Sequence, residues 1–229
     1  MSRRSLSWRS ILALPALLLP ALALAHGVAG KDASYLEQVH GVAFVPFLYL
    51  GAKHMVTGYD HLLFLAGVIF FLYRLRDVAL YASLFALGHS LTLMGAVLLN
   101  FRANAHVVDA VIGLSVAYKA FENLGGFRVF GLAPDPRAAV LGFGLVHGLG
   151  LATKLQELSL SRTGLAANMV GFNVGVELGQ LVALTLMVLL FALWRSTPSF
   201  QRSAQAANVA LLTAGFVLAG YQMAGYFLT

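Results

Sequence analysis

The stretch GLAANMVGFNVGVELGQLVALTLMVLLFALW, residues 164–194, decides the fold of this 229-residue chain. It carries a single charged residue, Glu177, and it exceeds the about 20 apolar residues that a helix needs to cross a bilayer. A water-soluble domain would carry about a quarter of charged residues, whereas this chain is 59% hydrophobic and only 10% charged. The stretch is therefore predicted to be a transmembrane helix.

Apolar runs of similar character lie on both sides of this stretch. We predict an all-α, polytopic membrane helical bundle of about six transmembrane helices, at residues 59–73, 77–99, 106–123, 138–158, 164–194 and 204–227. The run at 42–54 is shorter and contains Pro46 and Gly51. We expect it to form a short interfacial or re-entrant segment on the outer side of the membrane.

The first 25 residues have the pattern of a cleaved signal peptide. Arg3, Arg4 and Arg9 precede an apolar run at 11–24, and Ala23-Leu24-Ala25 supplies a cleavage site with small residues. Cleavage there leaves His26 as the new N-terminus, outside the cytoplasmic membrane. Its free amine and imidazole could together chelate a metal ion, or His26 could simply follow the cleavage site. Residues 26–229 are expected to form a single transmembrane domain.

The basic residues give the formal net charge of +6, but they lie between apolar runs and indicate topology instead of nucleic-acid binding. With the mature N-terminus outside, six arginines occupy the inner loops: Arg74, Arg76, Arg128, Arg137, Arg195 and Arg202. The outer segments carry Lys31, Lys53, Arg102 and Arg162. This excess agrees with the positive-inside rule and with a bacterial cytoplasmic (inner) membrane location.

Several polar residues interrupt the apolar runs and are the candidate functional residues. His54, Asp60 and His61 are expected near the outer mouth, whereas the other candidates are expected near the middle of the membrane: His89, His147, Asn173, Glu177 and Gln180. The chain has no cysteine, so a metal ion would need nitrogen and oxygen ligands, a set that suits nickel, cobalt, zinc or copper(II). Each residue alone has a structural alternative, such as a packing histidine or an Asp60 helix cap. The interpretation therefore depends on the whole set.

Four blocks containing these residues resemble the HupE/UreJ family of bacterial membrane proteins. They are HMVTGYDHLLF at 54–64, GHSLTL at 88–93, FGLVHGLG at 143–150 and FNVGVELGQ at 172–180. The resemblance implies a secondary permease for nickel, sometimes cobalt. The spacing His54-x5-Asp60-His61 is also similar to the His-x4-Asp-His signature of nickel/cobalt transporters, with one more residue between the histidine and the aspartate.

The leading hypothesis is import of a divalent transition metal ion, with nickel as the first candidate and cobalt, copper and zinc as alternatives. His54, Asp60 and His61 would capture the ion, and His89, His147 and Glu177 would form a second site, with Asn173 and Gln180 as weak or supporting ligands. We expect no permanently bound cofactor, no nucleic-acid partner and no enzymatic activity. The alternatives are an accessory protein that delivers metal to a larger membrane complex, and an intramembrane metalloenzyme. The sequence also leaves open whether the chain forms homo-oligomers.

Overall fold

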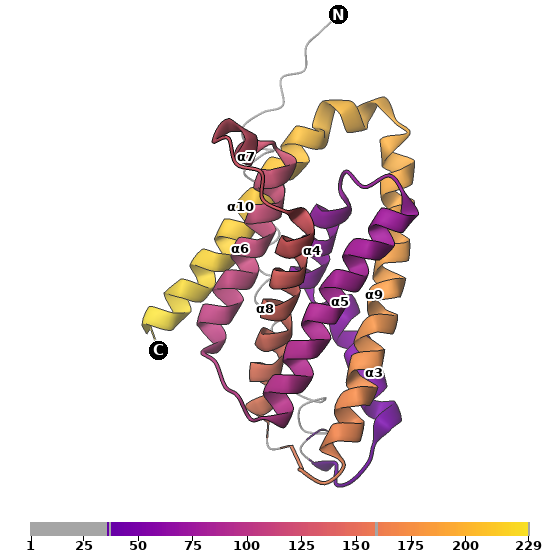
Figure 1. Ribbon diagram of the computed structural model, residues 1–229, viewed down its shortest axis with the longest axis vertical. Coiled ribbons are helices and arrows are strands. Elements are labelled where there is room, and N and C mark those ends of the chain that lie inside the picture. Colours follow the sequence, from indigo (N-terminus) through magenta and orange to yellow (C-terminus); the bar gives the residue numbers. More distant parts are fainter. Residues whose placement is uncertain (1–35, 37, 159, 229) are drawn as a thin grey trace, which may run out of the picture.

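The computed structural model describes residues 36, 38–158 and 160–228, and within them the chain is helical without strands (Figure 1). The predicted all-α bundle is thereby confirmed. The elements are α3 (Phe44–Thr57), α4 (Tyr59–Ile69), α5 (Leu75–Leu98), α6 (Ala105–Asn123), α7 (Gly126–Val129), α8 (Pro136–Gln156), α9 (Leu165–Arg195) and α10 (Pro198–Leu228). The predicted signal peptide at 1–25 and His26 lie outside the described residues.

Four helices are long and apolar enough to cross a membrane, namely α5, α8, α9 and α10. They correspond to four of the six predicted spans. The span predicted at 106–123 forms α6, which has 19 residues and contains Asp109, Lys119 and Glu122. The span predicted at 59–73 ends earlier, because α4 has only 11 residues and stops at Ile69. The bundle is therefore that of a multi-pass membrane protein.

Helices α3 and α4 follow each other with only Gly58 between them. Their 14 and 11 residues would together extend about 37 Å at 1.5 Å per residue, which is enough for one pass. The segment at 42–54, expected to be interfacial or re-entrant, lies mostly in α3, which packs along α9 and buries Phe47, Leu50 and Met55. The two helices therefore have the combined length of one pass, with a break at Gly58.

The loops define two ends of the bundle (Figure 1). At the upper end lie the α4–α5 link, α7 and the α9–α10 link; at the lower end lie the α5–α6 and α8–α9 links. Arg195 at the upper end donates to the carbonyl oxygens of Ile69, Phe70 (2.6 Å) and Leu72 (2.9 Å). Those carbonyls lie where α4 ends and need donors. Arg195 thus closes the short helix on this side.

Glycines hold the helices together in three close pairs, α3–α9, α5–α8 and α6–α10. A Cβ on Gly175 of α9 would overlap the carbonyl oxygen of Leu48 in α3, and one on Gly148 of α8 would overlap the carbonyl oxygen of His89 in α5. In the third pair, a Cβ on Gly113 would lie 2.6 Å from the backbone nitrogen of Ala219. Small residues let membrane helices approach until their backbones touch. Each pair is therefore fixed in register by glycine.

We predict that Gly175→Ala lowers the unfolding temperature of the detergent-solubilised protein. The added methyl group would force α3 away from α9, and overpacking of this kind costs about 1–3 kcal/mol. The matched control is Gly220→Ala in α10, where an added Cβ meets no atom within 4 Å. Equal unfolding temperatures for the two variants, measured by circular dichroism, would contradict the backbone contact.

Candidate metal site

Four histidines from four different helices meet in the middle of the bundle. They are His54 in α3, His61 in α4, His89 in α5 and His147 in α8. The ring centre of His61 lies 5.3 Å from that of His54, 5.5 Å from that of His89 and 4.9 Å from that of His147. His61 therefore lies at the centre of the cluster, in contact with the other three rings. We call these four side chains the histidine cluster.

The local backbone explains why these side chains converge. Gly58 ends α3 and starts α4, and a Cβ there would lie 3.3 Å from both Asp60 Oδ1 and His61 Nδ1. The break thus lets the carboxylate and the imidazole fold back over the chain beside His54. On the other side, the contact of Gly148 with the His89 carbonyl brings α5 and α8 together at the level of His89 and His147. The α3–α4 break and the α5–α8 contact therefore lie on opposite sides of His61.

Hydrogen bonds fix the orientation of two of the rings. Asp60 Oδ1 lies 2.9 Å from His61 Nδ1, and the carbonyl oxygen of Phe143 lies 2.7 Å from His147 Nδ1. Because a carboxylate and a carbonyl only accept, each Nδ1 must carry the proton in these bonds. The Nε2 atom of each neutral ring then keeps its lone pair for a ligand. Metal-binding histidines are commonly oriented by such partners.

The Nε2 atoms of His54, His61, His89 and His147 are all buried and lack a hydrogen-bond partner. The same holds for Nδ1 of His89 and for Oδ1 of Asn173. Buried polar atoms are nearly always bonded, so several unpaired atoms of one kind at one place require an explanation. A cation bound by the imidazole nitrogens would supply the missing interaction.

The spacing of the rings suits a metal ion, although the side chains must move to hold one. Two imidazoles bound tetrahedrally at about 2.0–2.1 Å have ring centres about 5 Å apart, close to the three separations from His61. In the described part of the chain, however, no three His, Asp or Glu side chains are already grouped closely enough to hold an ion. The cluster is therefore a site whose rings converge on His61 and would have to turn inward on binding.

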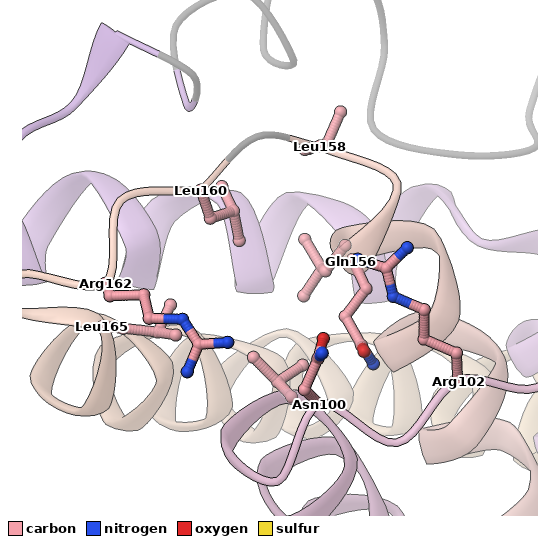
Figure 2. Close-up of a pocket in the computed structure, with 9 residues that line it drawn as sticks. Asn100, Arg102, Gln156, Leu158, Leu160, Arg162 and Leu165 are labelled. Atoms are coloured by element: carbon pink, nitrogen blue, oxygen red, sulfur yellow. The ribbon is translucent and has the colours of Figure 1, made fainter.

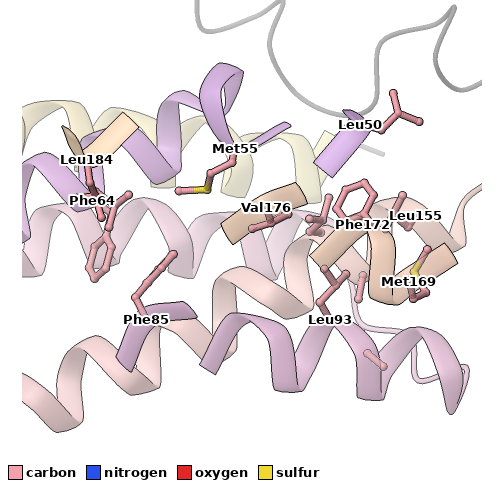
Figure 3. Close-up of a cluster of buried hydrophobic side chains, with 14 of the residues drawn as sticks. Leu50, Met55, Phe64, Phe85, Leu93, Leu155, Met169, Phe172, Val176 and Leu184 are labelled. Atoms are coloured by element: carbon pink, nitrogen blue, oxygen red, sulfur yellow. The ribbon is translucent and has the colours of Figure 1, made fainter. Parts of the chain in front are cut away.

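Phenylalanines form a second layer directly above the histidine cluster. Phe64, Phe85 and Phe143 each lie one helical turn from a cluster histidine, on the side of the upper end. Phe64 is 5.3 Å from Phe85, 5.7 Å from Phe143 and 5.1 Å from His147, measured between ring centres. Figure 3 shows Phe64 and Phe85 within the buried apolar cluster. This aromatic layer separates the histidines from the upper end.

The sequence predicted two separate sites, whereas the structure brings their histidines together in one cluster. His54 and His61, expected near the outer mouth, lie beside His89 and His147, because α3 carries the chain into the bundle before α4 begins. Asp60 joins them through its bond to His61. The Asn173 amide donates to the Met169 carbonyl oxygen, 3.0 Å away, and leaves its own oxygen unpaired.

Glu177 and Gln180 are not brought into the histidine cluster. Glu177 is exposed on the face between α9 and α5, where its carboxylate lies 3.5 Å from the Ser90 hydroxyl. Gln180 donates to the carbonyl oxygen of Ala82 in α5 at 3.1 Å. Both residues therefore connect α9 to α5. The aromatic layer was not predicted from the sequence, although its residues lie one helical turn from the histidines.

A cavity of about 230 Å³ at the lower end is separate from this site (Figure 2). Its polar lining comes from Asn100, Arg102, Gln156 and Arg162, with leucines around them. Two guanidinium groups repel a cation. The cavity is therefore unsuited to receive a metal ion.

Comparison with known protein families identifies the family of the chain. The family described as HupE / UreJ protein matches residues 30–229. The chain belongs to the HupE/UreJ family. This is a family of transporter type that is associated with nickel and cobalt transport. No curated protein and no solved structure matches the chain.

We predict that His61→Ala abolishes binding of nickel to this HupE/UreJ protein, because it removes the ring at the centre of the cluster. Asp60→Asn should weaken binding by about 10–100-fold, the usual effect of losing the partner that orients a ligand. Isothermal titration calorimetry on the detergent-solubilised protein measures both. The control is His40→Ala, an exposed histidine that is not one of the four cluster residues. Unchanged nickel affinity in His61→Ala would contradict the site.

Proposed function

We propose that this protein is a secondary transporter that carries a divalent transition metal ion, with nickel as the first candidate, across the cytoplasmic membrane into the cell. The proposal rests above all on four imidazoles from four helices whose buried Nε2 atoms have no partner in the protein. Neutral imidazole suits nickel, cobalt, copper and zinc, and the family association favours the first two.

The proposed direction follows from the charges at the two ends. The upper end carries the arginines expected in the inner loops, which include Arg74, Arg128 and Arg195. Arg102 and Arg162 lie at the lower end. By the positive-inside rule the upper end faces the cytoplasm. An imported ion would then reach the histidine cluster from the lower end and pass the aromatic layer afterwards.

The arrangement also supplies the physical steps that transport needs. An ion leaving water must exchange its hydration shell for ligands, and the cluster offers several imidazoles at one depth. Asp60 adds a negative charge that is directly bonded to the cluster. An inside-negative potential would contribute about 4.6 kcal/mol per 100 mV for an inward-moving dication. No nucleotide hydrolysis is needed for such uptake.

We predict metal-selective, His61-dependent uptake into liposomes that contain the purified protein. Nickel, cobalt, copper and zinc are tested separately with a fluorescent indicator inside the vesicles and an inside-negative potassium diffusion potential. His61→Ala should reduce uptake to that of protein-free vesicles, whereas His40→Ala should retain it. If the folded wild-type protein moves none of the four ions, the transporter assignment fails and a metal-delivery role becomes the better account.

The same assay tests the aromatic layer as a barrier. Phe64→Ala should raise the initial rate of nickel uptake severalfold while the calorimetric affinity stays within about threefold, because the ring lies beyond the ligands on the path to the cytoplasm. Phe71→Ala is the control, since that ring is 41% exposed and lies just after α4. An uptake rate that falls or stays the same in Phe64→Ala, with the protein still folded, would argue against a barrier at this layer.

A further inference from the structure

A buried ion pair lies on the lower side of the histidine cluster. Lys154 of α8 binds Asp109 of α6, with 2.9 Å between Nζ and Oδ2, and the two side chains are only 16% and 6% exposed. Lys154 follows His147 by seven residues, or about two helical turns, so the two lie on the same face of α8. A fixed positive charge thus lies about 10 Å along the helix from the imidazoles.

Asp109 is held in place by more than the lysine. Gln222 of α10 donates to Asp109 Oδ2 at 3.3 Å, and the other amide atom of Gln222 accepts from Nδ1 of His106 at 2.9 Å. The second carboxylate oxygen, Oδ1, is buried without a partner. Three helices, α6, α8 and α10, therefore combine to keep this carboxylate beside Lys154.

The Lys154 ammonium lies on the side from which an imported ion would reach the cluster, on the same face of α8 as His147. Asp109 binds this ammonium and offsets its positive charge. A lysine side chain is long and flexible. Without Asp109, the uncompensated charge would be free to turn toward the cluster and would repel an arriving dication.

We propose that Asp109 is a positioning residue that holds Lys154 in place and offsets its charge, and thereby sets the affinity of the histidine cluster for divalent cations. Lys154 is the opposing charge, and its pairing with Asp109 determines how much positive charge an ion meets on its way from the lower end. This inference rests on the proposed function, since it concerns the affinity of the same metal site.

The two single variants should change metal affinity in opposite directions. Asp109→Asn leaves the Lys154 charge uncompensated on the lower side of the cluster and should weaken nickel binding tenfold or more. Lys154→Gln leaves the Asp109 carboxylate without its opposing cation and should tighten nickel binding severalfold. Both should lower the unfolding temperature, because each leaves a buried charge unpaired. The double variant Asp109→Asn/Lys154→Gln should return to within about threefold of the wild-type affinity.

The matched control is another largely buried lysine–carboxylate pair, Lys119 with Glu122, at 2.6 Å and in α6 alone. Glu122→Gln also leaves a lysine unpaired, but toward the upper end, beyond the aromatic layer. It should lower the unfolding temperature without changing nickel affinity. A general loss of stability would lower the unfolding temperature of all these variants alike. The expected result differs from it, because nickel affinity falls in Asp109→Asn, rises in Lys154→Gln and stays the same in Glu122→Gln.

The experiment is calorimetric titration of nickel, and of cobalt in parallel, into the full mature chain, with the unfolding temperature recorded for every variant. Weaker binding in Lys154→Gln, or unchanged binding in Asp109→Asn, would overturn the inference. If Asp109→Asn does not fold, Lys154→Gln alone decides, since a purely structural ion pair predicts weaker binding and the positioning role predicts tighter binding. Failure of the wild-type protein to bind either metal would instead defeat the proposed function.

Discussion

Direct backbone contact at glycines is the constraint on which the rest of this structure depends. In a bilayer, apolar side chains gain little by leaving lipid, so helices associate where small residues let their backbones touch. Gly175 against Leu48 and Gly148 against His89 fix the register of α3–α9 and α5–α8. These registers in turn decide which residues of each pair reach the centre. Without them the cluster histidines would not share one level.

The second requirement is that the backbone at the break between α3 and α4 finds hydrogen-bond partners. The Gly58 amide donates to the His54 carbonyl oxygen at 2.7 Å, and the Gly58 carbonyl accepts from Leu62 at 3.1 Å. At the other end of α4, the Arg195 guanidinium binds the last carbonyls. Irregular backbone inside a membrane is tolerated only where protein or water satisfies it. The break at Gly58 lies beside polar side chains of the metal site, Asp60 and His61.

Sequence patterns predicted where the helices lie along the chain better than how deep their residues lie in the bundle. Length and hydropathy located α5, α8, α9 and α10, and four short blocks located the cluster residues. The position of His54 and His61 could not be predicted in the same way, because a surface segment followed by a span has the same pattern as one pass of two short helices. Gly58 was the only local sign of the break, and a single glycine in a helical run is ambiguous.

The orientation of Glu177 illustrates a similar limit. Asn173 and Glu177 are four residues apart and share a broad helix face, but successive i and i+4 positions differ by about 40° around the axis. On α9 that difference is decisive, since Asn173 is buried and Glu177 is exposed beside Ser90 of α5. Which of the two points inward depends on where α3 and α5 pack. That information is tertiary and is not contained in the periodicity of α9.

The histidine cluster and the aromatic layer are mechanically linked because they share their helices. His89 and Phe85 both belong to α5, and His147 and Phe143 both belong to α8, the partner to which α5 is joined by glycine contacts. His54 belongs to α3 of the other pair. A displacement of α5–α8 relative to α3–α9 would therefore change the distance of two imidazoles from His54 and, with it, the packing of two phenylalanines against Phe64 of α4. Any rearrangement that changes the separations of the imidazoles therefore also changes the packing of the aromatic layer above them.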